Sequence, residues 1–180
     1  MNSDNKKING WINLNKPEGI SSSKCVIILK KILNVKKIGH AGTLDPLASG
    51  VLPIAIGEAT KSIRFVSDEN KSYTFNICWG VETSTDDKDG TIVKETKKRP
   101  KKFNILKKIE KFTGEILQRP PIYSAIKING KRAYKIARSG KIPEIKKRKV
   151  TIFKFILKKI ISEDEAEFFV KCTKGTYIRS

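Results

Sequence analysis

The chain has 180 residues, of which 38 are Lys or Arg and 18 are Asp or Glu, and its formal net charge is +20. This length suits one domain with its own core, and a hydrophobic content of 38% is too high for a wholly disordered chain. No apolar run reaches the ~18–20 residues of a transmembrane helix, and the polar N-terminus lacks the apolar segment of a secretory signal, so we expect a cytoplasmic protein without a membrane span.

The predicted elements begin with a short strand at residues 10–14, where apolar and polar side chains alternate. A turn follows at residues 16–19, and Ser21 or Ser22 can cap the helix after it. This helix should end near Asn34. Its apolar residues recur at helical spacing and predict a buried face made of Cys25, Ile28, Leu29 and Ile32.

The segment at residues 38–50 is rich in glycine and small side chains and contains few large apolar groups. Because it cannot contribute much core, we interpret it as a loop that the fold holds for another reason. The chain continues with a buried strand at residues 51–56 and a short helix at residues 59–66.

Residues 71–80 alternate and predict a half-buried strand, with one face made of Tyr73, Phe75, Ile77 and Trp79. The Asp-Gly pair at residues 89–90 indicates a turn, which predicts that residues 91–93 form the hairpin partner of this strand. A basic linker at residues 97–102 leads into a helix that Gly114 ends. The apolar face of this helix consists of Ile105, Ile109 and Phe112.

The last third of the chain predicts a strand at residues 124–128 and a basic helix at residues 131–138. Residues 150–161 and 166–172 should pair as a hairpin across a polar turn. Strands and helices are interspersed without regular βαβ units, so the predicted fold class is α+β, and we expect residues 1–180 to form one domain.

The cysteine and histidine content limits metal chemistry. Cys25, Cys78 and Cys172 lie far apart and form no Cys-x-x-Cys pair, and His40 is the only histidine. Since zinc ligands normally come in close pairs, we expect no metal site and no disulfide framework. The basic excess has two interpretations, a lysine-rich surface without a partner or a surface that binds nucleic acid, and it favours the second.

The glycine-rich loop carries one carboxylate, Asp45, directly before Pro46. Aspartate before proline often caps a turn, and this purely structural role is one interpretation. The other is that a rigid loop presents the carboxylate as a nucleophile or a base. That chemistry requires a cation to keep the carboxylate ionised and oriented.

Motifs in this loop and elsewhere resemble those of one enzyme family. Residues 39–53, GHAGTLDPLASGVLP, closely resemble the catalytic motif of the TruB family of tRNA pseudouridine synthases. Other segments that match the family, in its order, are WINLNKPEGISS at 11–22, GEATK at 57–61, KSY at 71–73, PIYSAIKINGKRAY at 121–134 and KGTYIR at 174–179. Ordered motifs over nearly the whole chain are far more specific than a single short pattern.

The resemblance implies a pseudouridine synthase fold, which is a mixed, mostly antiparallel sheet flanked by helices, with a thumb-like loop that clamps RNA. It implies that the chain isomerises the uridine at position 55, in the T-arm loop of tRNA, to pseudouridine. The base is flipped out, its C–N bond to the ribose is broken and a C–C bond is formed. This reaction requires no metal and no redox cofactor, and the implied partner is tRNA, bound by a monomer.

The resemblance also implies the catalytic residues. Asp45 matches the family's catalytic aspartate, which attacks or deprotonates the ribose or the base. Tyr73 matches a tyrosine that stacks on the target base, and an ordinary strand-face aromatic is the alternative. Arg179 matches an arginine that pairs with the catalytic carboxylate, and an exposed arginine without a role is the alternative.

Three further matches concern the substrate. Tyr177 matches a pocket aromatic, with core packing as the alternative, and His40 matches a histidine on the RNA-facing side of the loop. Lys16, which lies in the N-terminal motif, is grouped with these RNA-binding residues and can help to position the Asp45 loop.

The segment at residues 127–149 is the predicted site of further RNA contacts, because the resemblance places the thumb-like loop here. The basic side chains that we assign to RNA are Lys127, Lys131, Arg132, Lys135 and Arg138. On a helix, Lys131, Lys135 and Arg138 would share one face and could follow phosphates. A merely solvated lysine face is the alternative.

Two features depart from the family pattern. Thr83-Ser84-Thr85 stands where the family has Thr-Asp-Thr, and the acidic run beside it does not fit a calcium loop, because Thr96 would occupy the position of the bidentate glutamate. The chain also stops soon after its arginine motif. We therefore expect a catalytic domain without its C-terminal part, and we expect no PUA-type domain in this chain. The rival hypotheses are an RNA-binding module without turnover and a small basic ribosome-associated protein.

Overall fold

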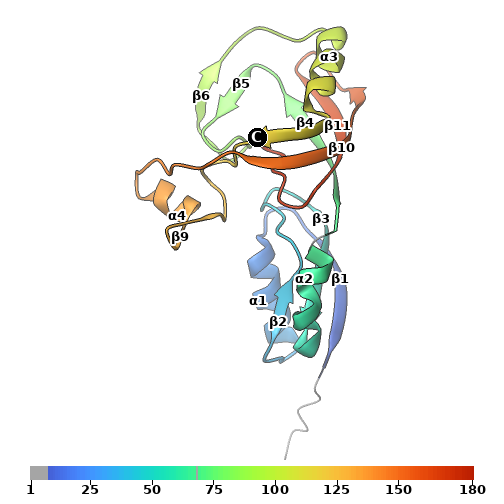
Figure 1. Ribbon diagram of the computed structural model, residues 1–180, viewed down its shortest axis with the longest axis vertical. Helices are drawn as coiled ribbons and strands as arrows, with labels where there is room; N and C mark the ends of the chain where they lie inside the picture. Colours follow the sequence, from blue (N-terminus) through green and yellow to red (C-terminus); the bar gives the residue numbers. More distant parts are fainter. Residues whose placement is uncertain (1–7, 68) are drawn as a thin grey trace, which may run out of the picture. The chain divides into compact units, whose positions relative to one another are not determined.

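A computed structural model of the chain describes residues 8–67 and 69–180 and has the α+β class that the sequence predicts. The chain divides into two compact units, Met1–Glu69 and Asn70–Ser180. Each unit has its own sheet and helices (Figure 1). The polar N-terminal segment of the sequence lies outside the described residues.

Three antiparallel strands form the sheet of the first unit. They are β1 (Gly10–Lys16), β2 (Ile38–His40) and β3 (Gly50–Ile56), with β3 in the middle. β3 takes the central place because it carries the apolar run, of which Leu52, Ile54 and Ala55 are almost fully buried. The loop predicted from residue 38 therefore begins with a strand, since Ile38–His40 pair with β3.

Helix α1 (Ser22–Ile32) packs against this sheet, and its start follows from the sequence. Ser21 is the N-cap, and its hydroxyl accepts a hydrogen bond from the main-chain N–H of Lys24 at 3.2 Å. Ser22 has a different role, described below. Beyond β3, the helix predicted at residues 59–66 is two short pieces, η1 (Gly57–Ser62) and α2 (Ile63–Ser67).

The buried face of α1 differs from the predicted one. Cys25, Val26 and Leu29 contact the core of the first unit, whereas Ile28 and Ile32 are 39% and 71% exposed. The prediction was wrong for these two isoleucines because all positions from 26 to 29 are apolar, so spacing alone does not select one face.

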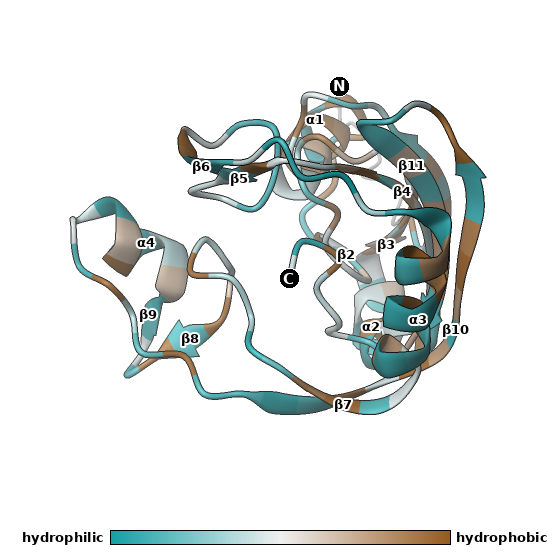
Figure 2. Ribbon diagram, turned by 90° about the horizontal axis from the view of Figure 1, so that it is seen from above, coloured by the Kyte–Doolittle hydropathy of each residue, from teal (hydrophilic) through white to brown (hydrophobic). Residues whose placement is uncertain are grey.

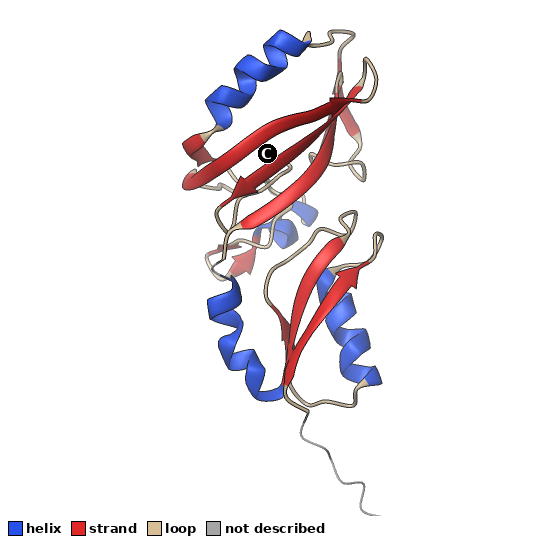
Figure 3. Cartoon of the chain, turned by 90° about the vertical axis from the view of Figure 1, so that its right-hand side faces the viewer, coloured by secondary structure: helices blue, strands red, loops and turns tan. Residues whose placement is uncertain are grey.

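The second unit contains a four-stranded antiparallel sheet of order β4-β11-β10-β7. Its strands are β4 (Lys71–Cys78), β7 (Gly114–Gln118), β10 (Arg148–Ile160) and β11 (Glu165–Cys172). Helix α3 (Lys102–Phe112) lies along one face of this sheet (Figure 3). The predicted hairpin between β10 and β11 and the predicted helix α3 are confirmed.

An aromatic cluster fills the space between α3 and the sheet. Phe168 is 1% exposed, and its ring lies 5.8 Å from that of Phe75 and 5.6 Å from that of Phe155. Ile105 of α3 is buried against the same cluster. A second cluster on the sheet includes Val170 and Cys172.

The predicted partner of β4 was wrong. β4 pairs with β11 along its whole length, and residues 92–95 form β6 (Ile92–Glu95), which pairs with β5 (Val81–Thr83) instead. All four residues of β6 are exposed, so β6 offers no apolar face to the alternating side chains of β4. β11 offers such an apolar face, because every second residue from Ala166 to Cys172 is buried.

The basic segment also differs from the prediction. It forms a small hairpin of β8 (Lys127–Ile128) and β9 (Lys131–Arg132), followed by the short helix α4 (Ala133–Arg138). Asn129 and Gly130 have φ of 48° and 80°, the backbone of a two-residue hairpin turn that Asn-Gly favours. Lys131 therefore lies in a strand and does not share a helix face with Lys135 and Arg138.

No helix in residues 8–67 and 69–180 combines the length and apolar composition needed to cross a bilayer.

The aromatic cluster predicts where the second unit is most sensitive. Phe168→Ala should lower the free energy of unfolding by about 3–5 kcal/mol, because it leaves a cavity among the rings of Phe75, Trp79 and Phe155. Phe103→Ala is the matched control, since Phe103 is 71% exposed on α3, and it should change stability by less than about 0.5 kcal/mol. Urea unfolding followed by circular dichroism measures both, and equal effects would contradict the assigned core.

Candidate active site

The Asp45 loop connects β2 to β3 in the first unit. Its ends are fixed by the sheet, where the N–H of Ala41 donates to the carbonyl of Pro53 at 2.9 Å. Within the loop, the N–H of Ala48 donates to the carbonyl of Asp45 at 3.0 Å and closes a turn. Gly42 has a φ of +135°, a conformation that residues with a Cβ rarely adopt. Asp45 itself is half-buried.

A buried lysine ammonium fastens this loop to the N-terminal motif. Lys16 is 0% exposed, and its Nζ donates to the carbonyl oxygens of Pro17 at 2.7 Å, Ile20 at 2.7 Å and Pro46 at 3.2 Å. An ammonium has three protons to donate, so the three carbonyls compensate for its removal from water. The sequence predicts that Lys16 helps to position the loop, and this contact with Pro46 agrees. Its burial contradicts its grouping with the RNA-binding residues, because no surface of the side chain is accessible.

A serine hydroxyl holds the other side of Asp45. Ser22 is 1% exposed, and its Oγ donates to the carbonyl of Leu44 at 3.0 Å and accepts from the N–H of Leu44 at 2.9 Å. The N–H of Gly19 adds a bond of 2.8 Å to the carbonyl of Pro46. Both neighbours of Asp45 are therefore bound through their main chains, so the backbone that carries its carboxylate is held in one conformation.

His40 stands where β2 ends and the loop begins. It is half-buried, and its Nδ1 lies within hydrogen-bond distance of the carbonyl of Gly42. This contact orients the imidazole relative to the loop. The contact of His40 with RNA stays a prediction.

In the second unit, Tyr73 lies on β4 and is half-buried. It packs against the cluster of Val170 and Cys172, to which Ile178 from the chain's last segment also belongs. Tyr73 and the KGTYIR motif are therefore neighbours in one unit. The phase of β4 agrees with the sequence prediction, since Tyr73, Phe75 and Ile77 share the more buried face.

Arg179 is nearly buried, with 13% of its side chain exposed, and it reaches three groups of the second unit. Its Nη1 donates to the carbonyl of Thr85 at 3.0 Å and to Oδ2 of Asp87 at 3.3 Å, and its Nη2 donates to the carbonyl of Tyr123 at 3.3 Å. These contacts fix the guanidinium. Asp45 belongs to the first unit, and its pairing with Arg179 stays a prediction.

Asp87 is a site residue that the sequence did not single out. Besides Arg179, its carboxylate accepts from the hydroxyl of Thr85 at 2.5 Å and from the N–H of Asp89 at 3.1 Å. The loop that departs from the family pattern is thus organised by a carboxylate within the acidic run. The only sequence signal for Asp87 was the density of acidic residues around it. From the sequence, this run was considered only as a calcium loop, and that interpretation was rejected.

The neighbouring Asp86 carries a raised pKa. Loss of hydration raises the pKa of its carboxyl above the usual value, Arg179 opposes this change, and Glu82 and Asp87 add to it. Burial is therefore the main reason why the ionised form of Asp86 is disfavoured, whereas the carboxylate of Asp87 bonds Arg179.

Tyr177 is held through both its main chain and its ring. Its N–H donates to Oε1 of Gln118 at 2.8 Å, and its carbonyl accepts from Nε2 of Gln118 at 2.8 Å. The guanidinium of Arg148 lies over its ring, 5.3 Å from the centroid. The sequence singled out neither Gln118 nor Arg148 as a partner of Tyr177.

The basic side chains assigned to RNA are all exposed, and they lie on β8, β9 and α4: Lys127, Lys131, Arg132, Lys135 and Arg138. Figures 1 and 2 show this segment standing away from the four-stranded sheet of its unit, and Figure 2 colours β9 as hydrophilic. Two contacts order it internally: Arg132 bonds the carbonyl of Ala125, and Arg138 lies 5.6 Å from the ring centroid of Tyr134. Because all five side chains are exposed, their charges are accessible to a ligand.

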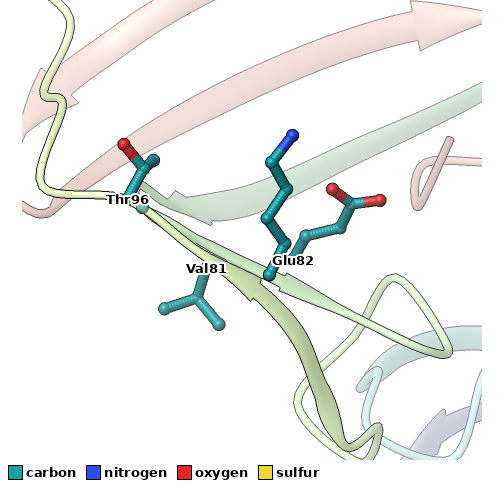
Figure 4. Close-up of a pocket in the computed structure, with 5 residues that line it drawn as sticks. Val81, Glu82 and Thr96 are labelled. Atoms are coloured by element: carbon teal, nitrogen blue, oxygen red, sulfur yellow. The ribbon is translucent and has the colours of Figure 1, made fainter.

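Other candidate sites carry less chemistry. A shallow pocket of about 210 Å³ at β5 and β6 is lined by Gly80, Val81, Glu82, Lys94 and Thr96 (Figure 4). In this view Glu82 and Thr96 point to one side of the strand pair and Val81 to the other. Within the described part of the chain, no group of three or more His, Cys, Asp or Glu is placed to hold a metal ion.

Comparison with known proteins identifies one family. The family model described as "TruB family pseudouridylate synthase (N terminal domain)" matches residues 30–178. Two curated proteins called tRNA pseudouridine synthase B are similar to the chain. The one from Bartonella henselae is 50% identical over 97% of this chain and 55% of its own length. The one from Ehrlichia chaffeensis is 51% identical over 95% of this chain and 58% of its own length. The chain thus spans a little over half the length of these relatives.

Solved structures show the same fold. A Cbf5-Nop10-Gar1 complex contains a chain that matches with a TM-score of 0.70 and 31% identity, over 97% of this chain and 42% of that one. An H/ACA RNP bound to a substrate RNA containing 2′-deoxyuridine matches with a TM-score of 0.67 and 29% identity, over 95% and 40% of the two chains. The family fold that the sequence predicts is confirmed.

The buried ammonium predicts a matched pair of lysine variants. Lys16→Met should lower the free energy of unfolding by about 2–4 kcal/mol, because three carbonyls lose their donor inside the protein. Lys24→Met, at an exposed position of α1, removes the same charge and should change stability by less than about 0.5 kcal/mol. Urea unfolding measures both, and a Lys16→Met chain as stable as the parent would show that the loop does not depend on this contact.

Proposed function

The chain belongs to the TruB family of pseudouridylate synthases, and on that basis we propose that it isomerises uridine 55 of the tRNA T-arm to pseudouridine. In this reaction the bond between N1 of the base and C1′ of the ribose breaks, and a bond between C5 and C1′ forms. The hydrogen on C5 leaves to solvent and N1 gains a proton, so electrons balance without a redox cofactor.

The observation that carries the proposal is the backbone anchoring of Asp45. A loop that contributes little core is bound on both sides of one half-buried carboxylate, by Ser22 at Leu44 and by Lys16 at Pro46. A carboxylate held in advance in one position is what nucleophilic or base catalysis requires, because little reorganisation then precedes the reaction. A structural turn alone would not need both clamps.

We assign the remaining roles in the same reaction. Tyr73 stacks on the extracted base, an interaction that contributes about 1–3 kcal/mol per base. Arg179 supplies the cation that keeps Asp45 ionised and oriented, and Tyr177 lines the pocket of the base. His40 contacts the RNA beside the loop. The family model supports the assignments of Tyr73, Tyr177 and His40, because its match over residues 30–178 includes these positions, and the match ends one residue before Arg179.

Binding of the surrounding RNA must offset the cost of extracting the uridine. Unstacking one base costs a few kcal/mol, and contacts of basic side chains with phosphates supply sequence-independent affinity. The exposed lysines and arginines of β8, β9 and α4 are suited to this task. We therefore propose that this segment is the thumb that closes on the T-arm.

The family model also crosses the boundary between the two units, which supports our proposal that residues 1–180 act as one catalytic domain. We further propose that one chain binds one tRNA as a monomer. The bacterial relatives support a cytoplasmic site of action, because bacterial tRNA is modified in the cytoplasm.

Turnover and its dependence on Asp45 can be measured by tritium release. The parent chain, incubated with a T-arm transcript labelled at uridine C5, should release tritium, and Asp45→Ala should lower the rate at least about a thousandfold. Glu163→Ala removes an exposed carboxylate from the turn between β10 and β11 and should leave the rate unchanged. RNA binding without release by the parent would support the module without turnover, and absence of binding would favour the ribosome-associated alternative.

The salt dependence of RNA binding tests the proposed thumb. Lys131→Ala and Lys135→Ala should each weaken T-arm binding and reduce the slope of log K against log salt by about 0.7–0.9 for each phosphate that the chain no longer neutralises. Lys111→Ala, which removes an exposed charge from α3, is the control and should leave the slope unchanged. If all three variants lower the affinity for RNA equally, then the net charge of the protein, and not the position of each lysine, determines binding. The thumb assignment is then wrong.

A further inference from the structure

Two side chains that stand opposite each other in the second sheet both reach the KGTYIR motif. Arg148 begins β10 and Gln118 ends β7, and the two residues are register partners. The carboxyl end of β7 and the amino end of β10 thus present one amide and one guanidinium side by side. Gln118 and Arg148 contact main-chain atoms of residues 175–180 and the ring of Tyr177.

The amide of Gln118 uses both of its polar atoms on this segment. Its Oε1 accepts from the N–H of Tyr177 at 2.8 Å. Its Nε2 donates to the carbonyls of Tyr177 at 2.8 Å and Ser180 at 2.9 Å. Gln118 is only 8% exposed, so water competes weakly for these bonds. A side chain thereby takes the place that a neighbouring strand would take.

The guanidinium of Arg148 acts on the same segment from the adjacent strand. Its Nη2 donates to the carbonyl of Gly175, and its Cζ lies over the ring of Tyr177. Gly175 has a φ of +78°, and a Cβ there would lie 3.1 Å from Nη2 of Arg148. A residue with a Cβ would be strained at this φ, and the guanidinium would have to shift by a few tenths of an ångström to admit it.

These contacts set the direction of three successive side chains. With the main chain of Tyr177 bound to Gln118, Ile178 enters the cluster of Val170 and Cys172. Arg179 then reaches the carboxylate of Asp87 and the carbonyl of Thr85. If residues 175–177 moved, the guanidinium of Arg179 would move with them.

We propose that Gln118 and Arg148 are positioning residues that hold Tyr177 and Arg179 in their working arrangement, an inference that rests on the proposed function. Neither residue needs to touch the reacting atoms. Their effect is on the geometry of groups that do, and displacements of about 1 Å can lower a rate about a hundredfold. Removal of either should therefore lower kcat far more than it changes the affinity for RNA.

The test compares kcat, KM and the exchange rate of one amide in the full chain. Gln118→Met keeps the length of the side chain and removes all three bonds, so kcat should fall about 10- to 100-fold while KM for T-arm RNA changes less than about threefold. Because the N–H of Tyr177 loses its acceptor, its hydrogen exchange, measured by NMR, should accelerate. Arg148→Lys keeps the positive charge but loses the guanidinium that bonds Gly175 and lies over Tyr177, and it should show the same split between kcat and KM.

The matched control is Glu115→Gln on β7. Glu115 pairs with Lys149 at 2.8 Å on the exposed side of the same two strands, so this variant disturbs the strand pair without touching the motif. It should leave kcat, KM and the Tyr177 exchange rate unchanged. Gln118→Glu is the second variant, which keeps an acceptor for the Tyr177 N–H but no donor, and it should retain amide protection while kcat falls.

Distinct results would overturn the inference. Unchanged kcat in Gln118→Met, despite faster Tyr177 exchange, would show that the contact exists but does not position the catalytic groups. An unprotected Tyr177 amide in the parent would show that the contact itself is absent. A parent without turnover would contradict the proposed function, and the exchange measurement would still decide whether Gln118 holds this segment.

Discussion

The first unit depends on a lysine ammonium removed from water. Burial of a charge is costly unless every proton finds an acceptor, and Lys16 finds three carbonyls, two in its own turn and one in the Asp45 loop. Since those carbonyls must converge on one atom, the loop has to approach the N-terminal motif closely. Glycines and small residues in the loop allow that approach, which explains how a segment with little core of its own becomes ordered.

The second unit uses the same principle with different chemistry. There an amide side chain, Gln118, binds the main chain around Tyr177, and a carboxylate, Asp87, organises the loop that meets Arg179. In both units a polar side chain with little exposure replaces a missing strand or helix partner. The backbones on either side of Asp45 and at Tyr177, two residues to which we assign roles in the reaction, are therefore held by polar side chains.

This arrangement explains what the sequence could predict. The alternation in β4 and the apolar spacing in α3 specify their elements, because one face of each is buried. The pairing of β4 with β11 and the face of α1 could not be read locally, since both depend on which apolar surface is presented from elsewhere in the chain. The Asn-Gly turn at residues 129–130 was readable and was missed, because the basic residues after it suggested a helix that begins at residue 131.

The candidate site shows a similar division. Asp45, Tyr73 and Arg179 are predicted from motif resemblance, because their chemistry resides in their side chains. Ser22 and Gln118 were not predicted as site residues, because their partners are main-chain atoms, and residue types alone do not show where a backbone passes. Asp87 was not predicted because nothing in the sequence distinguishes it from the other acidic residues of its run. Lys16 is intermediate, since its place in a motif suggested a positioning role but not its burial.

We infer that the Asp45 loop is held rigidly in the free protein, and amide hydrogen exchange at Leu44 is the measurement that tests this most directly. The N–H of Leu44 is bonded to the buried hydroxyl of Ser22 and lies in no regular element. We expect this amide to be protected as strongly as those of β3 in the absence of RNA. Exchange at the rate of an unstructured peptide would contradict it, because the carboxylate of Asp45 would then be positioned only after RNA binds.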